Sequence, residues 1–212
     1  MVSPGTPGWT LNETTDLLLK KEFDECRSKQ IPHRLFEQYG LGSLVPFKHP
    51  DIDRWRNSLH YGLMSRFQDT NIILTGGVDD VWQDTKDGSL IVVDYKSQAN
   101  SRSLTAESYL ADPYHYGYRV QMDFYSYLLQ EMGFSVSDIS YFLVCNANRS
   151  ATGFFGTLEF SETIIPYHWT ADWIPVKVTE MISLMNQTEI PDGNDSCVNC
   201  ASARERRRIE HI

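Results

Sequence analysis

The apolar residues of this chain follow a helical period in some stretches and form strand-like runs in others. A helix is expected over residues 10–27, where Thr10 and Glu13 form a capping-box pattern ahead of an apolar face. A second helix is expected to open at Pro50–Asp51, because proline suits the first turn of a helix. The apolar positions of this second helix keep helical spacing: Ile52, Trp55, Leu59 and Leu63.

Strand patterns dominate the next part of the chain. The runs 71–75, 78–82 and 89–96 are expected to be strands, and the turn signal Lys86-Asp87-Gly88 joins the last two into a hairpin. The polar stretch 97–113 is expected to be a long loop. The remaining expected elements are helices over 114–132 and 172–185 and strands over 139–146, 154–160 and 164–168. This order predicts an α/β fold with a central mixed β-sheet flanked by helices.

Size and charge narrow the class of protein. The 212 residues, 41% of them hydrophobic, are enough for one domain with a substantial core. We expect a flexible segment over 1–9, a domain over 10–190 and a polar tail over 191–212. The formal net charge of -9 counts against a protein that coats nucleic acid nonspecifically. It leaves open an enzyme that meets DNA at a local cleft, where bound cations offset the acidic residues.

The start of the chain and its cysteines bear on its location. The first residues lack the basic start and apolar run of a signal peptide, and no apolar stretch approaches the ~20 residues that span a bilayer. We therefore expect a cytoplasmic, intracellular protein that does not enter a membrane. In that setting the four cysteines are expected to be reduced thiols or metal ligands rather than disulfides.

The residues suited to chemistry gather at the predicted hairpin. Asp94 and Lys96 end an apolar strand, and because strand side chains alternate, they point to the same face. Asp79 lies on the preceding strand, where the hairpin register could place it beside Asp94 and so provide two oxygen ligands for Mg²⁺. Lys96 could then hold a water or stabilise charge on a phosphate. A structural ion-pair cluster at a sheet edge is the alternative interpretation.

Three motifs follow one another here: Gly76 to Asp79, Asp94-Tyr95-Lys96, and Gln121 to Tyr125. They resemble the PD-(D/E)XK nuclease superfamily, and within it the RecB-like branch that includes the CRISPR-adaptation exonucleases. The resemblance covers roughly residues 55–147 and implies a restriction-endonuclease-like core. It implies that Asp79, Asp94 and the Tyr95 backbone carbonyl bind the metal. It implies that Lys96 is the catalytic lysine. It also implies that Gln121 and Tyr125 support the site or contact DNA.

Two further features of the branch have partial counterparts in this chain. Some members carry a metal-binding histidine on a helix before the first motif, for which His60 is the candidate; a partly exposed helix histidine is the alternative. Cys197-x-x-Cys200 resembles the C-terminal part of an iron–sulfur pattern whose other cysteines lie upstream. Cys26 and Cys145 fall instead in a helix and in an apolar strand, and a cluster needs about four thiolates. We therefore expect no complete iron–sulfur cluster, but a partial metal site or free thiols at Cys197 and Cys200.

The sequence thus predicts a Mg²⁺- or Mn²⁺-dependent deoxyribonuclease. The resemblance implies that it is an exonuclease acting on single strands or ends of DNA, with other DNA-processing proteins as possible partners. One alternative is a non-catalytic DNA-end or partner-binding module that keeps the nuclease fold. The net acidity and the incomplete cysteine set motivate this alternative, whereas the complete set of Asp79, Asp94 and Lys96 counts against it. A metal phosphoesterase with a small-molecule substrate is a second alternative.

Overall fold

The computed structural model describes residues 10–101, 104–189, 191, 193 and 196–210. The segment 1–9, expected to be flexible, lies outside them. The chain divides into two compact units, Met1–Ala171 and Asp172–Ile212. The second unit contains helix α5, Trp173–Met185, and helix α6, Val198–Glu210. No helix among the described residues is long and apolar enough to cross a membrane.

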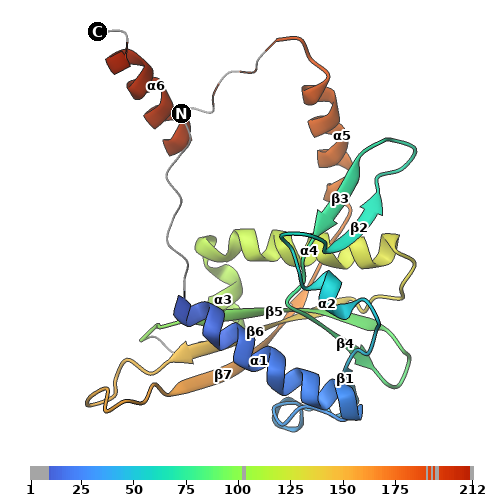
Figure 1. Ribbon diagram of the computed structural model, residues 1–212, viewed down its shortest axis with the longest axis vertical. Helices are drawn as coiled ribbons and strands as arrows, with labels where there is room; N and C mark the ends of the chain where they lie inside the picture. Colours follow the sequence, from blue (N-terminus) through green and yellow to red (C-terminus); the bar gives the residue numbers. More distant parts are fainter. Residues whose placement is uncertain (1–9, 102–103, 190, 192, 194–195, 211–212) are drawn as a thin grey trace. The chain divides into compact units, whose positions relative to one another are not determined.

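A five-stranded sheet forms the centre of the first unit (Figure 1). Its strands in spatial order are β1 (Leu44–Pro46), β4 (Asp80–Asp84), β5 (Leu90–Gln98), β6 (Ile139–Ala147) and β7 (Phe160–His168). β5 and β6 run parallel, and the other neighbouring pairs are antiparallel. A separate two-stranded sheet pairs β2 (Leu63–Arg66) with β3 (Ile73–Gly76). The predicted mixed sheet is therefore confirmed.

Helices cover both faces of this sheet, and α1 and α4 lie on opposite sides of it in Figure 1. The helices and helical turns of the first unit are α1 (Thr10–Lys29), η1 (Glu37–Tyr39), α2 (Ile52–Trp55), α3 (Ala106–Ala111), η2 (Pro113–His115) and α4 (Tyr116–Glu131). On the α1 face, Phe23 stacks on Trp82 with ring centroids 5.4 Å apart. On the other face, Met122 and Leu128 of α4 belong to a second buried cluster with Val92 of β5. The predicted helices flanking the sheet are confirmed.

The hairpin that carries the candidate residues also forms as expected. β4 and β5 are antiparallel, with Asp80 opposite Val93 at one end of the pairing. At the other end the chain turns through Gly88, whose φ of 79° is readily accessible to glycine. Residues 92 and 94 alternate with 93 and 95 between the two sheet faces, so the hairpin register decides which side chains meet.

Three sequence predictions were wrong in their elements. The second helix ends at Trp55, and Gly62, with a φ of 97°, leads into β2; Leu59 is consequently 88% exposed. The stretch 97–113 is not one loop, because β5 continues to Gln98 and α3 follows. The strand expected over 154–160 is a turn up to β7, in which Phe155 and Gly156 adopt positive φ values of 44° and 75°. The polar C-terminal stretch contains helix α6.

Candidate active site

Asp79 and Asp94 meet at the open end of the β4–β5 pairing. Extending the register by one residue beyond Asp80 and Val93 sets Asp79 opposite Asp94. Asp94 is buried, with 3% of its surface exposed, whereas the Asp79 side chain is 29% exposed. Burial and the charge of Asp79 raise the pKa of Asp94 to about 8. The predicted side-by-side placement of the two carboxylates is therefore present.

Lys96 lies on the same face as Asp94, as strand alternation predicts. Its ammonium forms a close ion pair with the Oδ2 oxygen of Asp94. That oxygen is enclosed and, within the described part of the chain, accepts no hydrogen bond of good geometry. A buried carboxylate oxygen without its full set of partners is costly. Lys96 therefore offsets part of the cost of burying the Asp94 carboxylate, and a divalent cation would offset more of it.

Tyr95 joins this site to a buried ion cluster on the α1 face. Its backbone N–H donates to Asp79 Oδ2 at 2.8 Å. Its hydroxyl donates to Asp80 Oδ2 at 2.8 Å on the opposite side of the strand. Asp80 is fully buried and forms an ion pair with Arg27 of α1. Burial raises the pKa of Asp80, and the Arg27 charge opposes that rise. Of the two neighbouring aspartates, Asp79 faces the site and Asp80 anchors the strand.

The structure also brings the third motif to the acidic pair. The Tyr125 ring lies over Gly76, where a Cβ atom would approach Cε1 of that ring to 2.6 Å. Gln121 Nε2 donates to the Tyr125 hydroxyl at 3.4 Å. Burial, together with the charges of Asp94 and Asp79, raises the pKa of Tyr125 to about 12. Gly76 is therefore required for the close approach that seats Tyr125 beside the two carboxylates.

Two side chains from α1 join the site, and the sequence analysis missed them. Lys20 Nζ lies 4.0 Å from Asp79 Oδ1 and 2.9 Å from Asp16 Oδ2. Burial raises the pKa of Asp16, and the charge of Asp79 adds to the rise while Lys20 opposes it. Their spacing of four residues marks a shared helix face. This signal is common on surface helices, so only the packing of α1 against the sheet identifies it.

The donor set suits a hard divalent cation. Asp79 and Asp94 supply carboxylate oxygens, and Asp94 Oδ2 lacks a well-formed hydrogen bond among the described residues. In an extended strand the N–H and C=O of one residue point to the same edge, so the Tyr95 carbonyl faces the side on which its N–H meets Asp79. Among the described residues, no three His, Cys, Asp or Glu side chains converge as a metal site. Backbone oxygen, water and substrate phosphate would complete the shell of such a cation.

His60 is not brought into this group. It lies in a turn after α2 rather than on a helix, its side chain is exposed, and its ring contacts Tyr61 at 6.5 Å between centroids. The helix that the sequence analysis expected around His60 stops at Trp55 because the backbone turns back: the Gly62 N–H donates to the Arg54 carbonyl at 2.9 Å. A role for His60 in metal binding stays a prediction.

The four cysteines lie in different settings. Cys145 is buried on the α1 face of β6, where burial raises its pKa to about 12. Burial also raises the pKa of Cys26 on α1. In the second unit, Cys200 N–H donates to Cys197 Sγ at 3.4 Å, and this bond lowers the pKa of Cys197. The lowered pKa favours the thiolate form of Cys197, which is the form that binds a metal.

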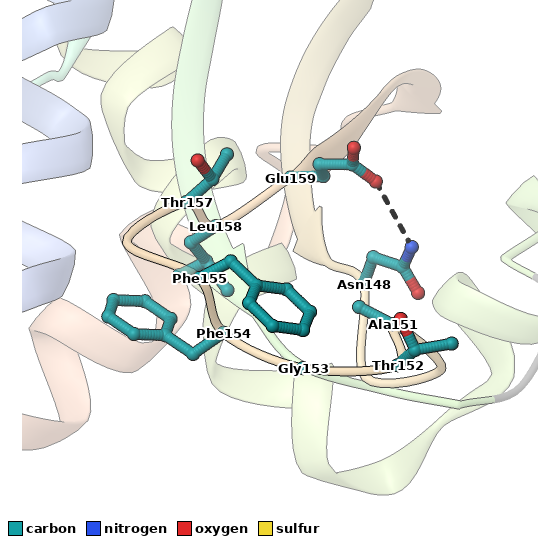
Figure 2. Close-up of a pocket in the computed structure, with 9 residues that line it drawn as sticks. All are labelled: Asn148, Ala151, Thr152, Gly153, Phe154, Phe155, Thr157, Leu158 and Glu159. Carbon is teal, nitrogen blue, oxygen red and sulfur yellow. Dashed lines mark hydrogen bonds between the residues drawn. The ribbon is translucent and has the colours of Figure 1, made fainter.

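A prominent hollow lies away from these groups, in the connection between β6 and β7. Figure 2 shows its lining, in which Phe154 and Phe155 are 71% and 87% exposed and Asn148 bonds Glu159 at 3.4 Å. Glu159 is the one ionisable side chain among the residues lining it. The chemistry described above is therefore not centred in this hollow.

Comparison with known families agrees with the fold. A sequence model of the PD-(D/E)XK nuclease superfamily matches residues 11–204. The chain belongs to this superfamily, whose members are generally nucleases that use divalent metals such as Mg²⁺. Searches of curated proteins and of solved structures gave no match. The superfamily is thus established for a region that includes both carboxylates and Lys96.

Proposed function

We propose that this protein is a divalent-metal-dependent deoxyribonuclease that hydrolyses phosphodiester bonds in DNA. The observation that carries the proposal is the meeting of Asp79 and Asp94, with Lys96 in ion contact with Asp94. Such a pair is unfavourable without a cation, because burial and mutual repulsion both oppose the charged form of Asp94. The family match supports a nuclease in particular.

Each group of the site has a role that follows from its chemistry. Asp79, Asp94 and the Tyr95 carbonyl would hold Mg²⁺ or Mn²⁺, which supplies charge neutralisation at the phosphate and a more acidic bound water. The Lys96 side chain, 19% exposed to solvent, brings an ammonium group that is suited to orient a water or to stabilise an oxyanion. Tyr125, held by Gly76 and Gln121, walls the site and limits where a substrate can lie.

The proposed substrate is a DNA single strand or end, cleaved by an exonuclease. The resemblance of the three motifs to the RecB-like branch supports this narrower assignment. A hollow of about 340 Å³ lies at the end of β5, where Gln98, two residues beyond Lys96, is among the residues that line it, and it offers room for part of a strand. Tyr114, which also lines this hollow and is 79% exposed, offers an aromatic ring on which an unpaired base could stack.

The test compares the cleavage of four substrates of the same sequence: a labelled linear single strand of DNA, a single-stranded DNA circle, a DNA duplex and an RNA strand. Each is incubated with Mn²⁺, with Mg²⁺ or with EDTA. The linear DNA strand should be shortened from an end only when a metal is present, and the circle should persist. Asp94→Asn should lower the rate by at least about 10²-fold. Asp69→Asn, an exposed carboxylate in a turn, is the matched control and should retain activity.

Other outcomes point elsewhere. Cleavage of the circle at the same rate would replace the exonuclease by an endonuclease. DNA binding with no cleavage, and no Mn²⁺ binding in calorimetry, would favour the non-catalytic module. Equal activity of Asp94→Asn and the wild type would show that Asp94 is not part of the active site.

A further inference from the structure

The Lys96 ammonium contacts an aromatic ring as well as a carboxylate. Its Nζ atom lies 4.4 Å from the ring centroid of Tyr118, which belongs to the first turn of α4. An ammonium over a ring face is attracted by the negative charge density of that face. The Asp94 carboxylate and the Tyr118 ring therefore both contact this cation.

These two contacts respond differently to a metal. A divalent cation at Asp94 competes with Lys96 for the carboxylate and repels the ammonium. The ring face of Tyr118 is uncharged and is no ligand for a hard cation, so its attraction for Lys96 persists. The ring is therefore the contact suited to keep Lys96 in place while Asp94 serves the metal.

The ring of Tyr118 is itself fixed by a stack of neighbours. Its plane lies 21° from that of His115, with centroids 5.4 Å apart. His115 in turn stacks on Tyr109, with centroids 4.0 Å apart, and its Nδ1 bonds the Tyr109 carbonyl at 2.8 Å. Tyr109 is 1% exposed and packs on Phe142 of β6. This column connects the Tyr118 ring to the buried core, so the ring is held rather than free to rotate away.

From this geometry we propose that Tyr118 is a positioning residue, whose ring face holds the Lys96 ammonium at the site when a divalent cation occupies the carboxylates. The proposal rests on the proposed function for its catalytic consequence. The contact itself is a property of the metal-free protein. The aromatic ring is required and the hydroxyl is not.

The first experiment measures the contact without any cleavage. Protons above a ring face are shielded, so the NMR signals of the Lys96 Cε protons should be shifted upfield in the metal-free wild type. Their loss in Lys96→Ala assigns them. The shift should persist in Tyr118→Phe, disappear in Tyr118→Leu, and remain in Tyr116→Leu. Tyr116 is the matched control, because it is 65% exposed on the same helix and its ring faces Arg119 at 5.6 Å.

The second experiment measures the consequence for turnover of single-stranded DNA in Mn²⁺. Tyr118→Leu should lower kcat about tenfold, the size of a partly desolvated cation–π contact, with little change in KM. Tyr118→Phe and Tyr116→Leu should both stay close to the wild type. Replacement of Tyr118 by pentafluorophenylalanine keeps the shape of the ring but inverts its charge distribution, and should reproduce the loss seen with leucine.

Several results would overturn the inference. One is an unshifted Lys96 signal in the wild type; others are an unchanged kcat in Tyr118→Leu or an equal loss in Tyr118→Phe. A rise in KM alone would assign the ring to substrate binding and would also overturn it. Should Tyr118→Leu fail to fold, the fluorinated ring decides the question. If the wild type cleaves no DNA, the proposed nuclease function fails, while the NMR shift still decides whether Tyr118 holds Lys96.

Discussion

The backbone N–H of Tyr95 donates a 2.8 Å hydrogen bond to the Asp79 carboxylate. The same residue uses its hydroxyl to bond Asp80 on the other side of the strand, also at 2.8 Å. Two neighbouring aspartates are thus held apart by one residue, with one directed to each face of β5. The position of Asp79 beside Asp94 is consequently held by a backbone N–H group of Tyr95. A substitution of the Tyr95 side chain leaves that N–H group in place.

Tyr95→Phe should therefore weaken the protein without disturbing the metal site. The substitution removes a buried hydrogen bond to Asp80, which remains bonded to Arg27 and to the Val81 N–H. We expect a loss of roughly 1–3 kcal/mol in the free energy of unfolding. Mn²⁺ affinity, measured by calorimetry, should stay unchanged. Tyr141→Phe, which alters a half-buried tyrosine on β6, is the control for the change of residue. A large drop in Mn²⁺ affinity of Tyr95→Phe would contradict this division of roles.

Asp94→Asn should stabilise the metal-free protein, and more so at higher pH. The folded-state pKa of Asp94, about 8, lies above its unfolded value, so the folded protein binds that proton more tightly. Stability is then lost as the pH rises from about 4 towards about 8, and asparagine does not suffer this loss. We expect Asp94→Asn to raise Tm in EDTA by roughly 2–4 °C at pH 8 and by less at pH 5. A lower Tm than wild type at both pH values would show that the charge of Asp94 stabilises the fold.

Lys96→Ala should separate turnover from metal binding. A charged lysine cannot ligate a cation, and it competes for Asp94 in the metal-free protein. We expect turnover to fall on the order of 10²-fold. Mn²⁺ affinity should be equal to that of the wild type or slightly higher. Weaker Mn²⁺ binding combined with a normal rate would reverse the roles assigned to Lys96 and Asp94.

Gly76→Ala should destabilise the protein because its methyl group collides with the Tyr125 ring. Strain of this kind costs about 1–3 kcal/mol. Gly117→Ala in α4 is the contrasting variant, since nothing lies within 4 Å of its Cβ position. It should gain up to about 1 kcal/mol from the higher helix propensity of alanine. Thermal or urea unfolding distinguishes the two. Equal stability of Gly76→Ala and wild type would show that Tyr125 is not held against Gly76.

The cysteines should not assemble a stoichiometric four-iron cluster in this chain. Cys145 is buried and its raised pKa disfavours the thiolate that iron requires. Cys197→Ser combined with Cys200→Ser should therefore change Tm little. Iron and sulfide analysis of anaerobically purified protein should find far fewer than about four of each per chain. A brown preparation with close to that stoichiometry would restore the full cluster pattern of the RecB-like branch.

Local sequence patterns predicted the acidic pair because a hairpin is a local structure. The turn at Gly88 fixes the register, and the register alone decides that Asp79 faces Asp94. The parallel neighbour β6 and helix α4 were also recognisable, since each is a long segment with a clear period. In contrast, Lys20 reaches Asp79 only through the packing of α1 on the sheet, which no spacing in the sequence reveals.

The failures have equally specific causes. Leu59 keeps helical spacing after Trp55, but its side chain is 88% exposed and so gives the helix no burial to continue for. Gly62 also opposes a longer helix, because it packs against the Gly76 carbonyl, which a Cβ at Gly62 would approach to 2.7 Å. The apolar residues Phe154 and Phe155 resemble the start of a strand, yet a positive φ at Phe155 makes a turn there. Periodicity indicates which side chains a segment could bury. The secondary structure of these two segments is set instead by the backbone conformation at Gly62 and Phe155.

The carboxylates and the aromatic residues of the site differ in the length of chain that connects the elements on which they lie. The carboxylates are joined by a short hairpin, and short loops close at small entropic cost. The aromatic residues Tyr118 and Tyr125 come from the long crossover between the parallel strands β5 and β6, whose closure is slower. In a refolding chain the acidic residues can therefore pair while water still surrounds them. The electrostatic cost of Asp94 arises from its burial, so the packing that encloses this carboxylate also creates the demand for a cation.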